Sequence, residues 1–236
     1  MRQYRAMPPR TALVTGAASG IGAALVTLLQ AEGTEVQHLD VVHGFEVSDP
    51  AAWDAVGAVE LACLNAGVTT GVTDLTQVDE AAYRRILGAN IDGVVYGVRR
   101  MAEVMEPGGA IVVTASLAGL VAAPQDPLYT LTKHAVVGFV RSVAPQLAAR
   151  GVRIGAVAPG FVDTPLLGDG RTLLATAGFP LLTPEDVAHA IVEAGRSKET
   201  GLVWVVQPGR EPEPFRFPSV PGPRDESGAA VGLPPS

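Results

Sequence analysis

The chain of 236 residues has a single cysteine, Cys63, and no run of lysine and arginine residues. One cysteine cannot form an internal disulfide, which is typical of proteins in a reducing cytosol. Cys63 lies within the apolar run 59–64, which favours a position in the core over a role as nucleophile. The formal net charge is −7, and no basic segment is long enough to follow a phosphate backbone. We therefore expect no nucleic-acid partner.

Long hydrophobic runs are also missing. The most apolar stretch, 109–124, is interrupted by Thr114, Ser116 and Gly119, so the sequence predicts no membrane span. The first ten residues are too polar for a secretory signal, and we expect a cytoplasmic protein. Hydrophobic residues make up 47% of the chain and charged residues 17%, a balance that excludes disorder of the whole.

Short apolar runs alternate with longer amphipathic stretches along the chain. The runs occupy 11–15, 35–39, 59–64, 109–115, 152–158 and 202–206, and the predicted helices lie at about 20–32, 79–105, 127–150 and 183–195. Continuous apolar runs are typical of strands that are buried on both faces of a parallel sheet. The pattern predicts a single-domain α/β protein with a Rossmann-like, doubly wound parallel sheet.

The regular alternation predicts three parts. Residues 1–10 form an N-terminal extension, 11–207 one Rossmann-like domain, and 208–236 a Pro/Gly-rich C-terminal tail without periodicity. Between Asp40 and Asn65 the chain is short. We expect only one short strand near 45–47 and one short helix near 50–56 in that stretch.

A glycine-rich turn follows the first predicted strand and opens the first predicted helix, with the sequence Thr15-Gly16-Ala17-Ala18-Ser19-Gly20-Ile21-Gly22. Glycine permits a tight turn and lets a pyrophosphate approach free N–H groups at the positive end of a helix. Asp40 ends the second predicted strand, 18 residues after Gly22. A carboxylate there accepts both hydroxyls of an adenosine ribose and repels a 2′-phosphate, so we predict NAD and not NADP. The alternative is an aspartate that simply ends a strand in solvent.

Tyr129 and Lys133 lie four residues apart at the start of the longest predicted helix, on one face of it. A nearby ammonium favours a phenolate and lowers the pKa of a tyrosine toward neutral pH. Ser116 stands 13 residues earlier, after a buried strand, where open α/β sheets bind ligands. Asn90 falls within a predicted helix, where asparagine is a mediocre helix former. It is either a satisfied polar core residue or an interruption of the helix that holds a water near Lys133.

These motifs together resemble the short-chain dehydrogenase/reductase family over about residues 10–206. The resemblance rests on the glycine turn and on Asn65-Ala66-Gly67, Asn90, Ser116, Tyr129-x-x-x-Lys133 and Pro159-Gly160-Phe161-Val162-Asp163-Thr164. It implies a tetrad in which Tyr129 is the general acid/base, Ser116 orients the substrate oxygen, Lys133 binds the nicotinamide ribose and Asn90 anchors a water.

The resemblance also implies the cofactor contacts and the assembly. The NAD-binding residues would be Gly16, Ser19, Gly20, Ile21, Gly22, Asp40, Asn65, Ala66, Gly67, Tyr129, Lys133, Pro159, Gly160, Val162 and Thr164, with no metal. Family members are commonly homotetramers or dimers built on two long helices, here about 79–105 and 127–150. The expected substrate is a small alcohol or ketone.

The sequence departs from the family pattern at several points. The excursion before Asn65 is shortened, and Glu46 and Asp49 are the nearest candidates for a contact with adenine. The leucines of the segment 165–182 are either ordinary core or the lining of a cleft for an apolar substrate. The last strand runs into Gln207-Pro208-Gly209 where many relatives have Asp-Gly-Gly. An NADP-dependent carbonyl reductase and a non-catalytic NAD-binding scaffold or sensor of the same fold are the competing interpretations.

Overall fold

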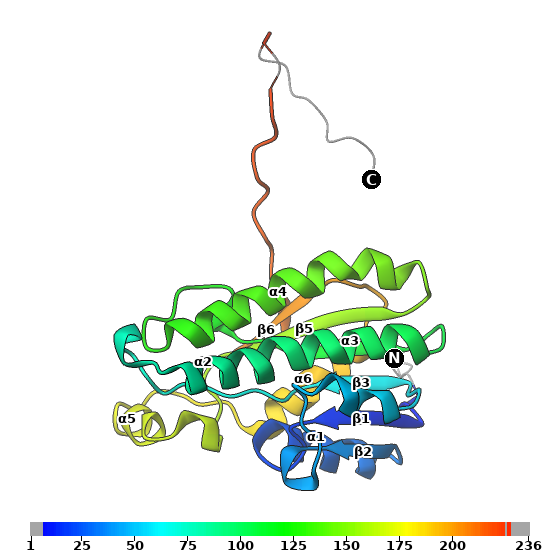
Figure 1. Ribbon diagram of the computed structural model, residues 1–236, viewed down its shortest axis with the longest axis horizontal. Coiled ribbons are helices and arrows are strands. Elements are labelled where there is room, and N and C mark those ends of the chain that lie inside the picture. Colours follow the sequence, from blue (N-terminus) through cyan, green and yellow to red (C-terminus); the bar gives the residue numbers. More distant parts are fainter. Residues whose placement is uncertain (1–6, 225, 228–236) are drawn as a thin grey trace.

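The computed structural model describes residues 7–224, 226 and 227, and its centre is one twisted sheet. Six strands are parallel and the last is antiparallel, in the order β2-β1-β3-β4-β5-β6-β7 (Figure 1). The strands are β1 (Thr11–Thr15), β2 (Glu35–Leu39), β3 (Leu61–Leu64), β4 (Ala110–Thr114), β5 (Arg153–Pro159), β6 (Val203–Val206) and β7 (Glu213–Pro214). The predicted Rossmann-like, doubly wound sheet is confirmed, and each of the six apolar runs contains a strand.

Helices cover both faces of this sheet (Figure 1). One face carries α2 (Glu80–Leu87), α3 (Gly93–Val104) and α4 (Pro127–Ala148), and the other carries α1 (Gly20–Ala31) and α6 (Pro184–Arg196). The short helix α5 (Gly170–Thr176) belongs to the segment after β5. Successive strand residues point to opposite faces of the sheet: Ile111 packs in the core on the side of α3 and α4, and Val112 in the core on the side of α6. No helix of the described residues is long and apolar enough to cross a membrane.

The long helix predicted at 79–105 has an irregular middle. Between α2 and α3 lies a π-helical turn, Gly88–Asp92, and Asn90 sits in it with its side chain fully buried. A π turn widens the hydrogen-bonded ring by one residue and is frequent at functional sites. The predicted interruption of the helix at Asn90 is therefore present in the structure.

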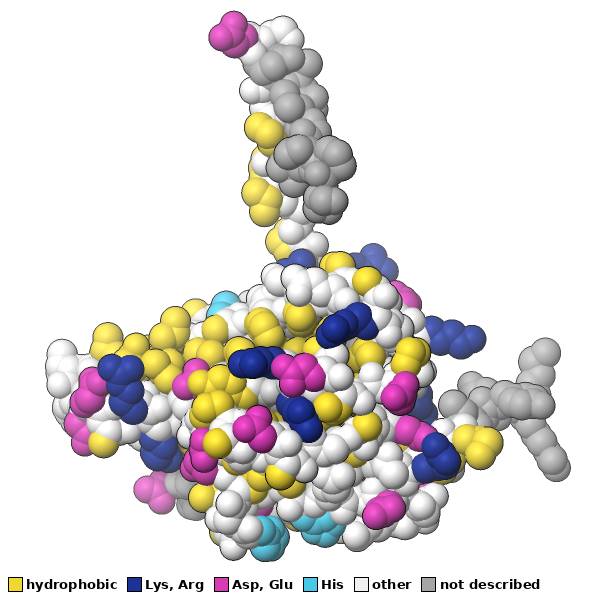
Figure 2. Space-filling view, turned by 45° about the vertical axis from the view of Figure 1, so that its right-hand side comes forward, with side chains coloured by type: hydrophobic (Ala, Val, Ile, Leu, Met, Phe, Trp, Pro, Cys, Tyr) yellow, Lys and Arg dark blue, Asp and Glu magenta, His cyan; other side chains and the backbone are white. Residues whose placement is uncertain are grey.

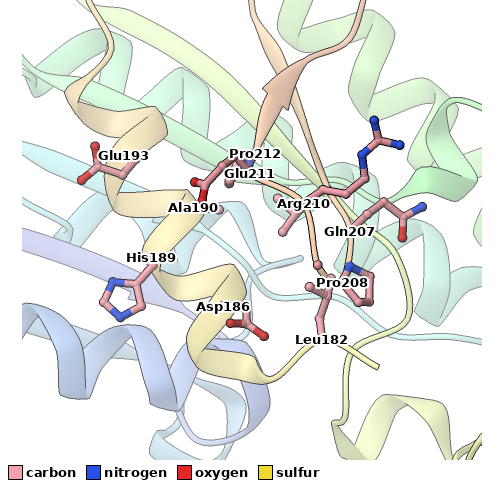
Figure 3. A pocket seen from close by; sticks show the side chains of 12 residues that line it. Leu182, Asp186, His189, Ala190, Glu193, Gln207, Pro208, Arg210, Glu211 and Pro212 are labelled. Carbon is pink, nitrogen blue, oxygen red and sulfur yellow. The ribbon is translucent and has the colours of Figure 1, made fainter. Parts of the chain in front are cut away.

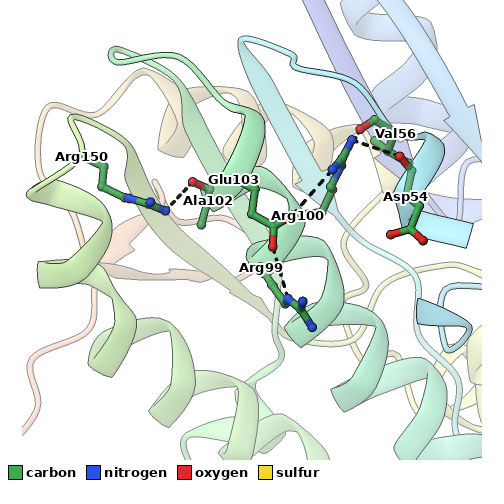
Figure 4. Close-up of polar contacts among 7 residues, drawn as sticks. All are labelled: Asp54, Val56, Arg99, Arg100, Ala102, Glu103 and Arg150. Carbon is green, nitrogen blue, oxygen red and sulfur yellow. Dashed lines mark hydrogen bonds and ion pairs between the residues drawn. The ribbon is translucent and has the colours of Figure 1, made fainter. Parts of the chain in front are cut away.

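Arginine side chains hold α3 against the elements on either side of it (Figure 4). Arg100 donates to the carbonyl oxygen of Val56 at 2.7 Å and to that of Asp54 at 3.1 Å. Arg150, just after α4, donates to the carbonyl oxygen of Ala102 at 2.6 Å. The Arg100 bonds fix α3 relative to the turn at 54–56, and the Arg150 bond fixes α3 relative to α4.

The strand predicted at 45–47 was wrong. That stretch is irregular and lies between two 3-10 turns, Val41–His43 and Pro50–Ala55. It does not pair with β2, which is the edge strand of the sheet and has β1 as its hydrogen-bonded neighbour. Side-chain packing holds the segment instead: Phe45 stacks edge-on against Trp53, whose indole N–H donates to the Val47 carbonyl at 3.0 Å.

The first part of the predicted tail is folded onto the body. Residues 213–214 add β7 to the sheet, and the Phe217 ring packs against the apolar core beneath the Arg141 guanidinium, 3.6 Å from its carbon. After these contacts the chain leaves the body beside α4 (Figure 1). Residues 1–6 of the predicted N-terminal extension, and 225 and 228–236 of the predicted tail, lie outside the described residues.

Candidate active site

The predicted site residues converge at the carboxyl ends of the parallel strands. Gly16 follows β1, Asn65 follows β3, Ser116 lies two residues after β4, and Pro159 ends β5. Because these strands are parallel neighbours, their ends meet at one edge of the sheet. Residues up to 143 positions apart in the sequence are brought together in this way.

Tyr129 and Lys133 face this edge from the first turns of α4. Asp126 caps the helix and accepts a hydrogen bond from the Tyr129 backbone N–H at 2.9 Å, with Pro127 at the first helical position. The Lys133 ammonium lies 5.5 Å from the centre of the Tyr129 ring and donates to the Thr114 carbonyl oxygen at 2.8 Å. Lys133 thus reaches from the helix to the end of β4, below the phenol.

The tyrosine and the lysine are both perturbed by their surroundings. Burial raises the pKa of Tyr129 to about 12, although a hydrogen bond with the Ser116 side chain acts in the opposite direction. Burial also lowers the pKa of Lys133 to about 8. In both cases burial disfavours the charged form. Perturbed groups of complementary chemistry in one cleft are typical of catalytic sites.

Asn90 connects the catalytic helix to the segment after β3. Its side-chain oxygen accepts from the Val68 N–H at 2.8 Å, and its amide nitrogen donates to the Val68 carbonyl and to the Thr132 hydroxyl, at 2.9 and 3.0 Å. A Cβ added to Gly67 would lie 3.3 Å from this side-chain oxygen and 3.5 Å from the Lys133 nitrogen. Asn90 is therefore a satisfied buried residue that also lies in an interruption of the helix beside Lys133. That it holds a water there stays a prediction.

The glycine turn is closely packed against the Asn65-Ala66-Gly67 segment. Gly16 has a positive φ of 65°, and a Cβ there would lie 2.9 Å from the Cα of Ala66. A Cβ on Gly22 would lie 1.9 Å from the Gly16 carbonyl oxygen, so no larger residue fits. Asn65 binds the ends of two strands, donating to the Thr15 carbonyl at 3.2 Å and accepting from the Thr114 hydroxyl at 3.1 Å.

Asp40 contacts the same turn from the end of β2. One carboxylate oxygen accepts from the Ala18 N–H at 2.9 Å and the other from the Val42 N–H at 3.1 Å. The side chain is not a free carboxylate in solvent, since it is 9% exposed and joins two loops. Each oxygen has a further lone pair that can accept a hydroxyl. Ser19 is the N-cap residue of α1, without a side-chain hydrogen bond to the helix, and Ile21 packs partly buried against the core on the α1 side of the sheet.

The predicted contacts after β5 lie opposite the glycine turn. A Cβ on Gly20 would meet the Thr164 side chain at 3.0 Å, so the two segments approach each other closely. Val162 is buried and pairs with Leu182 in an isolated bridge. Gly160 lies against Gln207, whose side-chain oxygen would be 2.6 Å from a Cβ there.

The segment between Thr164 and Leu182 forms an exposed apolar surface. Leu166 is 43% exposed, Leu173 71% and Phe179 47%, so these side chains are not ordinary core. The Phe179 ring packs edge-on against Phe161, with 5.6 Å between ring centres. The candidates for an adenine contact are both occupied locally: Glu46 accepts from the Ser48 N–H and Asp49 from the Ala51 N–H.

A pocket of about 300 Å³ lies elsewhere, between α6 and the turn at 207–212. Asp186 and Glu193 line it from the helix and Arg210 from the turn, as Figure 3 shows. In the same view the Gln207 side chain points away from α6. None of the four predicted catalytic residues lines this pocket, so it is separate from the site at the strand ends.

Three residues beside the site, Asp126, Thr69 and Thr70, were not anticipated from the sequence. Asp126 accepts, on its second oxygen, hydrogen bonds from the Thr69 hydroxyl and from the Thr70 N–H. The local sequence Asp126-Pro127 does predict a helix cap. It gives no indication of a partner 57 positions earlier.

Comparisons with known proteins agree with this geometry. A family model described as Enoyl-(Acyl carrier protein) reductase matches residues 49–192. A cis-4-hydroxycyclohexanecarboxylate dehydrogenase of Sinomonas cyclohexanicum is 35% identical over 79% of this chain and 89% of its own length. A cyclohexanol dehydrogenase of an Acinetobacter strain is 29% identical over 84% of this chain and 93% of its own length.

Solved structures show the same fold. A 3-ketoacyl-(acyl-carrier-protein) reductase from Brucella melitensis, complexed with NADH, has a TM-score of 0.75 at 26% identity, over 85% of this chain and 98% of that one. Another structure with this fold, ElxO at 23% identity and a TM-score of 0.70, has NADP bound; the match covers 84% of this chain and 96% of that one. The chain belongs to the short-chain dehydrogenase/reductase family. It is therefore an oxidoreductase of the Rossmann-like type.

Proposed function

We propose that the protein is an NAD-dependent dehydrogenase of secondary alcohols, with a largely apolar, cyclic substrate. The observation that carries the proposal is the group at the strand ends: the Tyr129 side chain bonded to Ser116, with the buried Lys133 nitrogen 5.5 Å from its ring. A phenol, a hydroxyl donor and an ammonium in one cleft suit proton transfer to and from a substrate oxygen.

The residues present fit a dinucleotide. Gly16, Gly20 and Gly22 have no side chains, so the turn between β1 and α1 packs closely and a pyrophosphate could approach the N–H groups at the start of α1. Ser19, Gly20 and Ile21 would complete this contact, and Asn65, Ala66 and Gly67 would flank the adenosine. Pro159, Gly160, Val162 and Thr164 would hold the nicotinamide end.

Asp40 supports NAD over NADP. Its two oxygens are fixed by backbone N–H groups of both neighbouring loops, so the carboxylate cannot swing away from an incoming phosphate. A 2′-phosphate would face this charge, whereas ribose hydroxyls donate to it. The two residues that follow, Val41 and Val42, are exposed and offer no positive charge.

Each catalytic residue has a distinct role in the proposed reaction. A bound oxidised nicotinamide would accept a hydride from the carbinol carbon. The Tyr129 phenolate takes the proton of the alcohol hydroxyl and becomes a phenol, while Ser116 donates a hydrogen bond to the same substrate oxygen and holds it in place. Lys133 binds the ribose and stabilises the phenolate, and Asn90 holds the segment through which water reaches Lys133. In the reverse direction Tyr129 returns the proton to the oxygen of the ketone.

The substrate class rests on two observations. The relatives described above are named for their action on cyclohexanol and on a hydroxycyclohexanecarboxylate. In this chain the exposed apolar side chains Leu166, Leu173 and Phe179 occupy the segment that would cover the substrate. Burial of apolar surface against a ring would supply most of the binding free energy.

Absorbance of NADH tests the function. Purified protein is mixed with NAD and a panel of secondary alcohols, cyclohexanol and cis-4-hydroxycyclohexanecarboxylate included, and with the matching primary and acyclic alcohols. We expect turnover with cyclic secondary alcohols, and kcat/KM for NAD well above that for NADP. Turnover with NADP alone would contradict the cofactor assignment, and no turnover with any member of the panel would contradict the substrate class.

We also propose a cytoplasmic homo-oligomer built on α3 and α4. Ala135, Gly138 and Ser142 form an exposed line of small residues on α4, which permits close approach of a second helix. In Figure 2 hydrophobic side chains gather along the upper part of the body, at the height of α4 in Figure 1. Residues 11–207 would form the catalytic domain, and the tail from 208 an extension whose first part, as far as Phe217, packs against that domain.

A further inference from the structure

We infer that Asp126 is a positioning residue for Tyr129, acting through the bridge that its carboxylate makes to Thr69 and Thr70. This inference rests on the proposed function, since it assigns a residue that sets the position of the proposed acid/base. The N-cap of an ordinary helix binds only the first turn of its own helix. Asp126 binds that turn and, in addition, a loop from the other side of the cleft.

The bridge uses both carboxylate oxygens. One accepts from the Tyr129 N–H at 2.9 Å, and the other accepts from the Thr70 N–H at 2.9 Å and from the Thr69 hydroxyl. Hydrogen bonds to a charged acceptor are roughly twice as strong as neutral ones. The backbone of Tyr129 is therefore tied to the loop through one rigid group.

This bridge closes a ring of hydrogen bonds around the catalytic turn. From Tyr129 the ring continues through its carbonyl, which accepts from the Thr132 hydroxyl at 2.8 Å, and Thr132 in turn accepts from Asn90 at 3.0 Å. Asn90 binds both backbone groups of Val68, the residue before Thr69. The loop and the helix are joined at two points, and Tyr129 lies between them.

The charge of Asp126 also acts on Tyr129. Burial alone would raise the pKa of Asp126, but the hydrogen bonds from Thr69, Tyr129 and Thr70 outweigh it and hold the pKa below its ordinary value. The carboxylate stays ionised, and its negative charge is one of the causes that raise the pKa of Tyr129. Three other groups face Tyr129 or the bridge. Lys133, on the same helix, has a positive charge, and Ser116, after β4, faces the phenol with a neutral hydroxyl. Arg85 of α2 faces the bridge, since it donates to the Thr69 carbonyl at 3.1 Å.

Two substitutions break the bridge from opposite sides. Asp126→Ser keeps a helix cap but is too short to reach the loop, and Thr69→Ala removes the hydroxyl without touching the cap. A misplacement of about 1 Å costs on the order of 100-fold in rate, so we expect kcat to fall by about 10- to 100-fold in each variant. The KM for NAD should stay within about twofold, because the glycine turn is not involved. Thr69→Ser restores the hydroxyl and should restore kcat.

Matched controls separate positioning from simple capping. Asp79 caps α2 by accepting from the Ala82 N–H at 2.7 Å, and the Thr76 hydroxyl donates to Asp74 at 2.8 Å, a bond of the same type as that of Thr69. Asp79→Ser and Thr76→Ala should leave kcat unchanged. Thermal unfolding of all variants identifies any loss of kcat that merely follows from loss of folded protein.

Two readouts decide the inference. In a double-mutant cycle the kcat losses of Asp126→Ser and Thr69→Ala should not add, because both remove the same bond. Asp126→Asn should shift the pH profile of alcohol oxidation to lower pH, because it removes a negative charge beside Tyr129. Fully additive losses, or kcat within twofold of wild type in both bridge variants, would overturn the inference. If the unsubstituted protein oxidises no alcohol with NAD or NADP, the proposed function fails. The bridge can still be tested in that case, because the Tyr129 amide should be more protected from hydrogen exchange in the unsubstituted protein than in the two bridge variants.

Discussion

Replacement of Tyr129 with phenylalanine removes one oxygen atom from the proposed centre of the reaction. The ring remains to pack 5.5 Å from the Lys133 nitrogen, and the hydrogen bond with Ser116 is lost. One such bond contributes about 1 kcal/mol, so we expect the free energy of unfolding to change by no more than that. The protein should remain folded and should still bind NAD, as titration of intrinsic fluorescence would show.

The chemical step should suffer far more than the fold. General acid/base catalysis contributes about 10²- to 10⁴-fold, and Tyr129 is the proposed donor and acceptor of the proton. We expect kcat of Tyr129→Phe to fall by that factor at saturating NAD and alcohol, measured as NADH absorbance. A kcat within tenfold of wild type under these conditions would show that another group transfers the proton.

The pH dependence provides an independent measure of the same residue. With a pKa of about 12 in the free protein, only about one Tyr129 in 10⁴ is ionised at pH 8. Ionisation near pH 8 requires a decrease of about four units, or about 5 kcal/mol of interaction with positive charge at roughly 1.4 kcal/mol per unit. Lys133 and an oxidised nicotinamide are the proposed sources. The oxidation rate should therefore rise with pH with an apparent pKa several units below 12, and a profile governed by a pKa near 12 would refute the reasoning.

Three further substitutions test other parts of the site. In Asp40→Asn the ratio of kcat/KM with NAD to kcat/KM with NADP should fall by at least tenfold. The substitution removes the charge that repels a 2′-phosphate but keeps an acceptor for the Ala18 N–H, and an unchanged ratio would count against Asp40 as the residue that selects NAD. Gly22→Ala should abolish NAD binding in calorimetry, since its Cβ would lie 1.9 Å from a carbonyl oxygen, and normal affinity would contradict the tight turn. Lys133→Met should flatten the pH dependence of stability. The pKa of Lys133 is about 8 in the folded protein and 10.5 ordinarily, so the free energy of unfolding of the wild type should increase as pH rises from 8 to 10.5, by at most about 3 kcal/mol. Urea unfolding at several pH values in this range should show no such increase in the variant. Light scattering at micromolar concentration should report an oligomer, and a monomer would refute the assembly on α3 and α4.

The sequence predicts the fold well because its signals are local. Most apolar runs are bounded by turn residues, and each run corresponds to a strand. Asparagine has a low helix propensity, so Asn90 by itself indicates an interrupted helix. The strand predicted at 45–47 fails for a non-local reason. Phe45 and Val47 suggest a strand beside the edge strand β2, but packing of Phe45 on Trp53 and the bond from the Trp53 indole N–H to the Val47 carbonyl hold the segment in an irregular path.

The candidate site divides in the same way. Gly16 and Tyr129 belong to motifs that are contiguous in sequence, so their positions follow once the order of strands is known. The bridge from Asp126 to Thr69 joins two loops with no shared pattern, and only the three-dimensional structure reveals it. Sequence motifs identify the groups proposed for the chemistry, and Asp126 and Thr69, proposed to fix the position of Tyr129, lie outside those motifs.

The opposite effects of burial on Tyr129 and Lys133 define a constraint on the site. In the free protein near neutral pH, burial favours a neutral phenol and makes the ammonium of Lys133 easier to deprotonate, with its pKa at about 8. A base that is ionised without its cofactor would hold an unpaired charge in a poorly solvated place, which is costly. The arrangement avoids that cost, because the phenolate becomes favourable only when positive charge is added next to it. In the proposed reaction, competence for proton transfer would then be coupled to occupancy by the oxidised cofactor, so that a proton is removed only when a hydride acceptor is present.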